Sequence, residues 1–435
     1  MEASRPIRAL HVFPLFGSDL PNGSERYAYL LTKALVCAGV QVDVFTTCAR
    51  RIVVQDGFSL QWPNEYPPGI SHDGDLPIER FPTNLTMPAS VGRHALRLFG
   101  RHVGREQHRL GPPPEDGSPL LPMYQHRVMS GLSRWSDWLG TMSRGPLSVP
   151  LLHAVWRQLR LYDLVLVSSF PLSLVPAVVS LARARKKPAV VLPFFHANDL
   201  PNNSPLLGRS LLRASAVLTL TEHSTSHLAH IYPGVRNWQV GAGVDPSGLD
   251  DARISGRRFR AKYDIGDGKL ILFAGRKQAG KRYQVAIDAV NLLSDPGARL
   301  VMVGEEVDGV PIAGERVRYL GWVSNDELWD AFDACDVFVL PSRFESFGLV
   351  FLQAWIRGKP VIGDAGCPAV CSLIEDGVDG FLCSDAKQTA LRLESLLADA
   401  GMRTAMGEAG RRKVLGNYTW EIVAGKVRSV YEALR

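Results

Sequence analysis

The stretch Pro341-Ser-Arg-Phe-Glu345-Ser-Phe-Gly348-Leu-Val-Phe-Leu-Gln353-Ala-Trp355 decides the fold class of this chain. An apolar run at 335–340 precedes it and predicts a buried strand, and residues 349–357 have the spacing of a helix. Glu345 and Gly348 therefore lie where the carboxyl end of a strand turns into a helix, which is where open α/β sheets bind ligands. Helix-start amides suit an anionic oxygen, whereas a carboxylate suits a neutral, hydroxyl-rich group. A sugar on a diphosphate would use both features.

The composition predicts a globular protein with more than one domain. At 435 residues, with 46% apolar and 21% charged residues, the chain is too long for one ordinary domain. A net charge of +6 without a nucleic-acid-binding motif argues against a nucleic-acid partner. The six cysteines form no C-x-x-C pair, so neither a zinc ribbon nor a thioredoxin-like site is supported.

The sequence predicts a cytoplasmic protein. Residues 1–8 lead directly into a predicted strand without the apolar core of a signal peptide. No apolar run reaches the roughly 18 residues of a spanning helix. The closest association with a membrane that we expect is peripheral, at the inner face.

The N-terminal residues predict the first unit of a Rossmann-like domain. A strand at 7–13, a glycine-bearing loop, a helix at 25–38 and a strand at 40–46 follow one another. The dinucleotide fingerprint G-x-G-x-x-G is absent, so Asn22-Gly23 is either a plain turn or part of a ligand loop. His196 closes a predicted strand at 189–196, again at a ligand-binding end, although a lone histidine is commonly structural.

Residues 50–160 are less regular and contain a row of arginines. Within a predicted helix at 91–110, arginines recur every four residues, so that neighbouring ones share a face: Arg93, Arg97, Arg101, Arg105 and Arg109. Such a helix can contact an anionic membrane or an anionic acceptor, and the simpler alternative is a solvated face. Asp73-Gly-Asp75 resembles a metal-binding D-x-D but lies in a Pro/Gly-rich loop and reads as a turn, so we expect no metal.

The second half repeats the strand-loop-helix pattern from residue 269. A strand at 269–275 delivers Arg276 and Lys281 into a loop that leads to a helix amino end. Cations at that place complement a diphosphate, Arg276 through its planar fork and Lys281 as a point charge. The chain is therefore predicted to be α/β, with two Rossmann-like, doubly wound domains that face each other across a cleft.

Together these residues resemble the GT-B glycosyltransferases, in particular the retaining family 4 (glycosyl transferases group 1), over nearly all of the chain except about 50–160. The most specific parts are Gly275-Arg276, Lys281 and the Pro341–Leu349 motif. The resemblance implies an N-terminal acceptor-side domain at 1–248, a nucleotide-sugar donor domain at 249–415, and a C-terminal helix at 416–435 that crosses back.

The resemblance also implies roles for single residues. The catalytic set is Glu345, which contacts the donor sugar, with His196, Arg276 and Lys281. The remaining donor contacts are a loop against the diphosphate, a backbone segment against the base, and amides and side chains around the sugar and ribose: Asn22, Gly23, Trp322, Val323, Ser346, Phe347, Gly348, Leu349 and Gln353.

Three positions depart from the family pattern. Gln353 stands where a second glutamate usually holds the ribose, Asn22 replaces a glycine, and the usual G-G-x-P-E loop is reduced to Gly366-Cys-Pro-Ala. A charged hydrogen bond stronger by roughly 1–2 kcal/mol is absent at Gln353, although an amide still offers an acceptor.

The predicted function is metal- and cofactor-independent transfer, with retention, of a hexose-type sugar. The donor is a nucleotide diphosphate sugar, with UDP favoured and GDP an alternative. The acceptor is a carbohydrate, lipid-linked or small-molecule hydroxyl. The alternatives are an epimerase or phosphorylase of the same fold, or a non-catalytic nucleotide-sugar-binding homologue.

Overall fold

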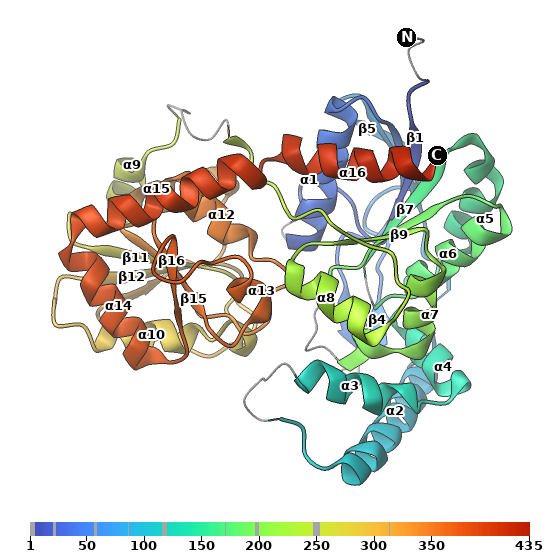
Figure 1. Ribbon diagram of the computed structural model, residues 1–435, viewed down its shortest axis with the longest axis horizontal. Coiled ribbons are helices and arrows are strands. Elements are labelled where there is room, and N and C mark those ends of the chain that lie inside the picture. Colours follow the sequence, from blue (N-terminus) through green and yellow to red (C-terminus); the bar gives the residue numbers. More distant parts are fainter. Residues whose placement is uncertain are drawn as a thin grey trace. The chain divides into compact units, whose positions relative to one another are not determined.

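The computed structural model describes residues 5–20, 23–55, 59–85, 87–114, 120–169, 171–195, 200–246, 253–312 and 314–435. The chain forms two compact units (Figure 1). The first unit comprises Met1–Gly241 and Trp420–Arg435, and the second comprises Ala242–Thr419. Both units are α/β, as expected from the sequence.

The first unit is built on an eight-stranded sheet of order β10-β9-β8-β7-β1-β2-β6-β5. Every neighbouring pair is parallel except β5 and β6, which form an antiparallel hairpin. Its strands are β1 (Arg8–Phe13), β2 (Gln41–Thr47), β5 (Gly69–Asp73), β6 (Leu76–Phe81), β7 (Leu164–Ser168), β8 (Ala189–Leu192), β9 (Ala216–Thr219) and β10 (Asn237–Gln239). A separate hairpin pairs β3 (Val53–Gln55) with β4 (Ser59–Gln61).

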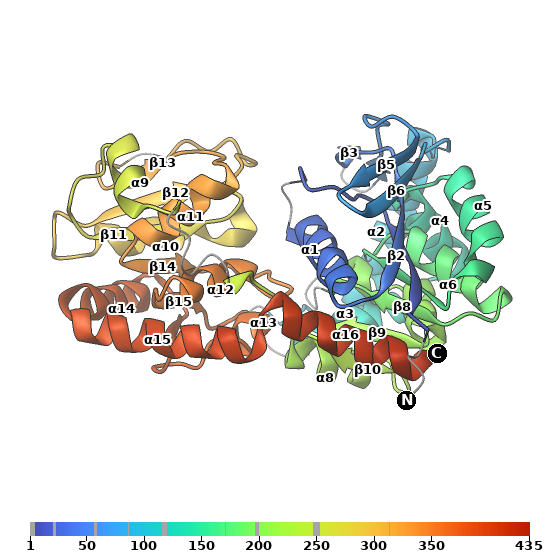
Figure 2. The same cartoon turned by 90° about the horizontal axis from the view of Figure 1, so that it is seen from above.

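Helices cover both faces of this sheet (Figure 2). They are α1 (Gly23–Cys37), α2 (Ala89–Leu110), α3 (Leu120–Ser130), α4 (Arg134–Arg144), α5 (Val149–Gln158), α6 (Leu174–Ala184), α7 (Pro205–Arg213), α8 (Glu222–Ile231) and α16 (Trp420–Leu434), with short 3-10 turns at Leu159–Leu161 and Leu200–Asn203.

Alternation along β1 divides its side chains between the two faces. Leu10 and Val12 belong to the hydrophobic core that includes α5 and α6 residues. His11 points to the other face, where its ring nitrogens lie 2.9 Å from Thr32 Oγ1 in α1 and 3.1 Å from Tyr431 Oη in α16. The last helix of the chain is therefore fastened to its first strand.

The second unit contains a fully parallel six-stranded sheet of order β13-β12-β11-β14-β15-β16. Its strands are β11 (Leu270–Ala274), β12 (Arg299–Val303), β13 (Val317–Tyr319), β14 (Val337–Leu340), β15 (Val361–Asp364) and β16 (Gly380–Cys383). Its helices are α9 (Gly256–Lys262), α10 (Tyr283–Asn291), α11 (Asn325–Ala334), α12 (Leu349–Ile356), α13 (Pro368–Cys371), α14 (Ala386–Ala398) and α15 (Ala400–Asn417), with a 3-10 turn at Ala279–Lys281.

Each sheet reverses its strand order once. In the second unit the chain moves outward from β11 through β12 to β13, and then returns to the other side of β11 to continue through β14, β15 and β16. In the first unit the corresponding reversal lies between β1 and β7. Open α/β sheets bind ligands at the carboxyl ends of the strands beside such a point.

The region 50–160 holds more regular structure than its sequence predicted. The helix with the arginine row is present as α2, and Gly74-Asp75 forms the tight turn of the β5–β6 hairpin, with Gly74 at φ +61°. The hairpin itself was missed. No helix within the described ranges is both long and apolar enough to cross a membrane.

Candidate functional site

Two loops beside the switch point of the second unit bring Lys281 and Glu345 into contact. Lys281 ends the 3-10 turn after β11, and Glu345 lies in the loop after β14, the strand that pairs with β11. Lys281 Nζ donates to Glu345 Oε1 at 2.5 Å, and their side chains are only 16% and 12% exposed. A cation and a carboxylate separated by 64 positions in sequence thus form one pair at the carboxyl edge of the sheet.

Arg276 is the exposed cation of the same edge. It follows β11 after Gly275, and its guanidinium makes no hydrogen bond or ion pair with the described part of the chain. An arginine with its planar fork free can bind an anionic oxygen in bidentate fashion.

Lys277, the neighbour of Arg276, points into the protein instead. Its side chain is 1% exposed, and its Nζ pairs with Glu306, at 2.9 Å, and with Asp308. Burial alone would lower the pKa of Lys277, but the hydrogen bonds to Asp308 and Glu306 raise it overall. The backbone of Lys277 also donates to the Glu305 carbonyl at 2.8 Å, so this residue joins the loops after β11 and β12.

Gly348 opens α12 in a conformation that favours glycine. Its φ is +94°, and a Cβ at this position would lie 2.7 Å from a ring carbon of Phe351. Phe347 and Gly348 are buried, whereas Ser346 and Leu349 are partly exposed. The free amides of a helix start therefore follow Glu345 directly.

The other donor-side candidates lie further along the same edge. Gln353 is in the second turn of α12 and is partly exposed. Trp322 and Val323 follow β13, and Trp322 is 66% exposed. All of these candidates belong to loops or helix starts at the carboxyl ends of the parallel strands.

Asp364 forms ion pairs with two further cations at this edge. It ends β15 and is 0% exposed, and it pairs with Arg282 and, at 3.0 Å, with Arg343 Nε. The amide of Gly366 donates to the same carboxylate at 2.6 Å. Arg282 adopts the left-handed conformation with φ 49°, which costs an L-residue about 1–2 kcal/mol. Burial and then the Arg343 guanidinium lower the pKa of Arg282.

In the first unit, only part of the predicted site lies within the described residues. Gly23 begins α1, and a Cβ there would meet no atom within 4 Å, so glycine is not required for packing. Asn22 and His196 lie outside the described residues. The described chain before His196 ends at Phe195, whose ring lies 5.6 Å from that of His227 in α8.

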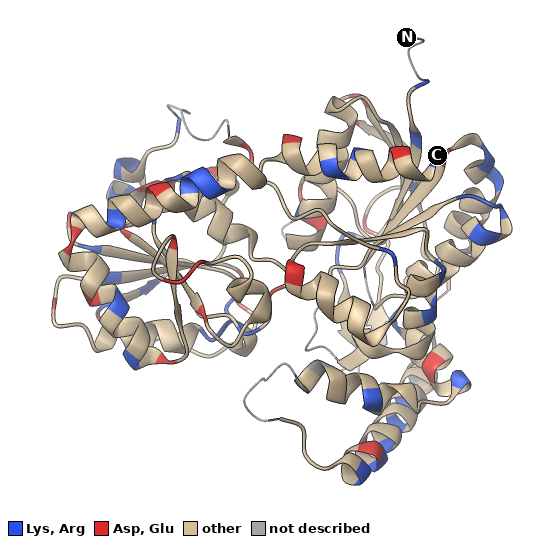
Figure 3. Ribbon diagram, viewed as in Figure 1, with Lys and Arg blue, Asp and Glu red and all other residues tan. Residues whose placement is uncertain are grey.

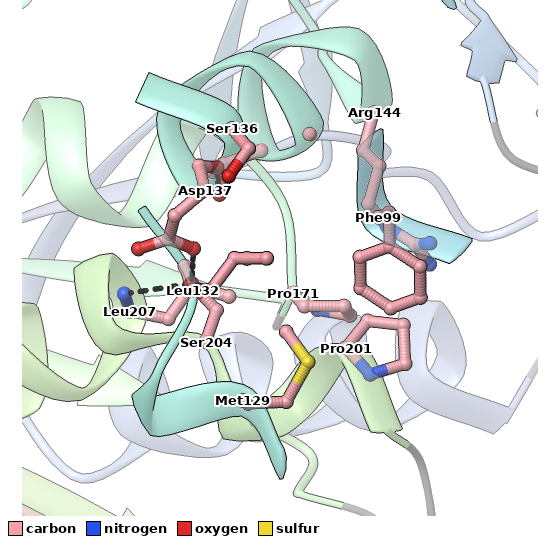
Figure 4. Close-up of a pocket in the computed structure, with 12 residues that line it drawn as sticks. Phe99, Met129, Leu132, Ser136, Asp137, Arg144, Pro171, Pro201, Ser204 and Leu207 are labelled. Atoms are coloured by element: carbon pink, nitrogen blue, oxygen red, sulfur yellow. Dashed lines mark hydrogen bonds between the residues drawn. The ribbon is translucent and has the colours of Figure 1, made fainter. Parts of the chain in front are cut away.

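A small pocket in the first unit lies between α2, α3, α4 and α7 (Figure 4). Its wall is largely apolar, with Phe99, Met129 and Leu132 beside the buried carboxylate of Asp137. That carboxylate accepts hydrogen bonds from Ser204 Oγ and, at 2.7 Å, from the Leu206 amide. Burial raises the pKa of Asp137, and these hydrogen bonds act in the opposite direction. Asp137 thus fastens α4 to the start of α7.

Sequence reasoning missed Asp364 and its two arginines. A charged residue at the end of the apolar strand Val361-Ile-Gly-Asp364 was a signal, as was a second cation directly after Lys281. The partners of Asp364 lie 82 and 21 positions away in sequence, so only the fold identifies them.

Comparison with known proteins finds a family match within the second unit. Residues 256–413 match the family described as glycosyl transferases group 1. The D-inositol 3-phosphate glycosyltransferase of Geodermatophilus obscurus is 26% identical over 98% of this chain and 88% of its own length. The sulfoquinovosyl transferase SQD2 of Arabidopsis thaliana is 28% identical over 45% of this chain and 39% of its own length. For the first four curated relatives, the match spans about a third to a half of the relative.

Solved structures share the fold over nearly the whole chain. HepE of Anabaena, in complex with UDP and glucose, has a TM-score of 0.66 at 15% identity and covers 98% of this chain and 100% of its own. The trehalose-6-phosphate synthase OtsA has a TM-score of 0.67 at 13% identity, over 98% of this chain and 99% of its own. These likenesses confirm the predicted GT-B fold.

Proposed function

We propose that this protein is a retaining, metal-independent glycosyltransferase, because residues 256–413 match the glycosyl transferases group 1 and the chain has the GT-B fold. It moves a hexose-type sugar from a nucleotide diphosphate donor to an acceptor hydroxyl. UDP is favoured over GDP because HepE, of the same fold, is described in complex with UDP and glucose.

The observation that carries this proposal is the Lys281–Glu345 pair at the switch point, with the exposed Arg276 and the start of α12 on the same edge. Two cations suit the acidic phosphates, and a carboxylate suits sugar hydroxyls. In the absence of donor, each member of the pair neutralises the other. With donor bound, Lys281 turns to the diphosphate and Glu345 to the sugar.

The reaction breaks the bond between the anomeric carbon and the phosphate oxygen, and it forms a bond from that carbon to the acceptor oxygen on the same face. The acceptor proton passes to the departing phosphate oxygen. Arg276, Lys281 and the α12 amides stabilise the charge that develops on the leaving diphosphate. These groups supply the positive charge that a metal ion would otherwise provide.

We assign the remaining candidates by the family resemblance. The role proposed for Asn22 and Gly23 is diphosphate binding, and the role proposed for His196 is to contact the donor sugar; Asn22 and His196 lie outside the described residues. Around the nucleotide and sugar lie Trp322, Val323, Ser346, Phe347, Leu349 and Gln353, with Gln353 at the ribose.

The proposal is tested by thermal-shift measurement of the purified protein with UDP- and GDP-sugars, because a ligand that binds the folded state raises its apparent stability. NMR analysis of the products then separates the alternatives. An epimerase converts the donor without acceptor, and a phosphorylase requires free phosphate. If the protein binds the donor but neither transfers the sugar nor slowly hydrolyses the donor, it is a non-catalytic binding protein.

Replacing Arg276 with alanine is expected to weaken UDP binding by roughly 10- to 100-fold, since a hydrogen bond to a charged group contributes about 1.5–3 kcal/mol. Isothermal titration calorimetry with UDP measures this change. Arg257→Ala, at an exposed position of α9 in the same unit, is the matched control and should bind UDP as the wild type does. Equal affinity of Arg276→Ala and wild type would contradict the assignment.

We further propose that α2 brings the protein to the inner face of an anionic membrane, where a lipid-linked acceptor would be available. Positive residues recur along this helix (Figure 3), and all five of its row are exposed: Arg93, Arg97, Arg101, Arg105 and Arg109. Exposed basic side chains on a helix are attracted to anionic lipid.

Substituting Arg97 and Arg101 by glutamine is expected to reduce binding to phosphatidylglycerol vesicles about 30-fold, because each basic residue near the surface contributes about 1 kcal/mol. Co-sedimentation measures the bound fraction, with phosphatidylcholine vesicles as a reference. The control replaces the exposed Arg157 and Arg160 by glutamine. If wild-type protein does not bind anionic vesicles even at low salt, the proposed membrane contact through α2 is wrong.

A further inference from the structure

Arg282 occupies a backbone conformation that glycine would adopt without strain. Its φ of 49° and ψ of 36° place it in the left-handed region, directly before α10. Within the described part of the second unit, the other non-glycine residue with positive φ is Asp264, in the exposed turn after α9. Strained residues at candidate sites persist where the surrounding structure holds them in place.

The guanidinium of Arg282 makes contacts that hold the residue in this strained backbone conformation. Its Nη1 pairs with the buried Asp364, and its Nη2 donates to the Ser384 carbonyl at 3.1 Å. Asp364 is shared with Arg343, which lies two residues before Glu345, and with the Gly366 amide. A Cβ at Gly366 would lie 2.8 Å from Arg343 Nε, so these groups are closely packed.

Asp364 and its partner Arg282 therefore connect four loops of the same sheet edge. Arg282 comes from the loop after β11, Arg343 from the loop after β14, Gly366 from the loop after β15, and Ser384 from the end of β16. The Arg343 amide also donates to the Gly280 carbonyl at 3.3 Å, directly beside Lys281. Movement of Arg282 would thus reach both members of the Lys281–Glu345 pair.

The charges of this cluster suit an anionic ligand. Four cations and three carboxylates lie at this edge, which leaves one positive charge unbalanced: Arg276, Lys281, Arg282 and Arg343 against Glu345, Asp364 and Asp385. The side chains of Arg282 and Arg343 are 23% and 30% exposed, so their charge reaches the surface of the edge. The two acidic phosphates of a sugar diphosphate would be attracted to this positive charge.

We propose that Arg282 is a positioning residue of the donor site. Through Asp364 it fixes Arg343 and the loops after β14 and β15, and so holds Lys281 and Glu345 in the arrangement that receives the diphosphate. This inference rests on the proposed donor binding. It assigns to Arg282 and Asp364 a role in affinity for the donor, beyond their part in holding the fold.

Arg282→Gly provides the test, because glycine relieves the backbone strain while it removes the guanidinium. The variant is expected to bind UDP at least roughly tenfold more weakly than wild type in calorimetry, while its melting temperature stays within a few degrees. Asp264→Gly is the matched control, since it relieves the same strain away from the site; its UDP affinity should equal that of wild type. Arg282→Lys should give an intermediate affinity.

A double-mutant cycle with Asp364→Asn separates positioning from general loss of fold. In the Asp364→Asn background, Arg282→Gly should weaken UDP binding little further, and the calorimetric stoichiometry reports the folded fraction of each variant. Wild-type protein that binds neither UDP nor GDP would overturn the proposed function and this inference with it. Wild-type protein that binds UDP with the same affinity as Arg282→Gly would overturn only the role of Arg282.

Discussion

Replacing Glu345 with glutamine is expected to reduce the rate of sugar transfer by roughly 10²- to 10³-fold, the usual effect of removing one preorganised electrostatic contact from a catalytic site. Glutamine has nearly the same shape, so packing around the start of α12 is retained. The change removes the negative charge that pairs with Lys281 and that, in the proposed donor site, would strengthen hydrogen bonds from sugar hydroxyls. The measurement is the turnover number with a UDP-sugar and an acceptor identified by product formation.

Binding and turnover should respond differently to this substitution. The Lys281 cation no longer has a carboxylate partner in Glu345→Gln, so it is free for the diphosphate, and affinity for UDP alone should be maintained or increased. Glu315→Gln, at an exposed position of the same unit, is the control and should transfer sugar at the wild-type rate. Full transfer activity in Glu345→Gln would exclude Glu345 as the sugar-contacting residue.

Acidification from pH 6.5 to pH 4 is expected to destabilise the first unit by several kcal/mol. Burial lowers the pKa of His11 to about 3, and burial together with His223, His230 and His126 lowers the pKa of His227 to about 4. Between these values and the ordinary value near 6.5, the unfolded chain binds protons that the folded unit does not bind, so stability falls as pH falls. Each residue contributes roughly 3 kcal/mol of loss by pH 4, at about 1.4 kcal/mol per pH unit.

Urea unfolding of wild type, His11→Gln and His227→Gln at pH 7, 5.5 and 4 measures this dependence. Each variant should lose less stability than wild type between pH 7 and pH 4, because one proton-binding site of the unfolded chain has been removed. His94→Gln, on the exposed face of α2, is the control and should follow the wild-type curve. Parallel curves for all four proteins would show that neither buried histidine governs the acid response.

The fold followed from the sequence where neighbouring residues specify an element. The strand before Pro341 and the helix after Gly348 were predicted because an apolar run and a helical period lie side by side in the chain, and both appear as β14 and α12. The β5–β6 hairpin was missed because β5 is exposed at the sheet edge and lacks an apolar pattern. Because its side chains are mostly exposed on both faces, the sequence of β5 shows no alternation of apolar and polar residues.

The candidate site was predictable in its residue types but not in its contacts. Arg276, Lys281 and Glu345 follow strands in sequence, and this alone placed them at the carboxyl edge. That Lys281 meets Glu345, and that Lys277 turns inward although it lies beside Arg276, depends on which loops the sheet order brings together. Strand order is a long-range property, and local patterns do not encode it.

The attachment of α16 to β1 has a consequence for biosynthesis. The second unit is an insertion into the first, which the chain leaves after Gly241 and rejoins at Trp420. On the ribosome, which makes a chain from its N-terminus, the second unit is complete before α16 exists. Until then Thr32 alone can pair with His11, and the face of α1 that packs on α16 remains uncovered. The unit whose synthesis begins first is therefore the last to be completed. A chain that is truncated directly after Thr419 contains the whole second unit, but its first unit lacks α16.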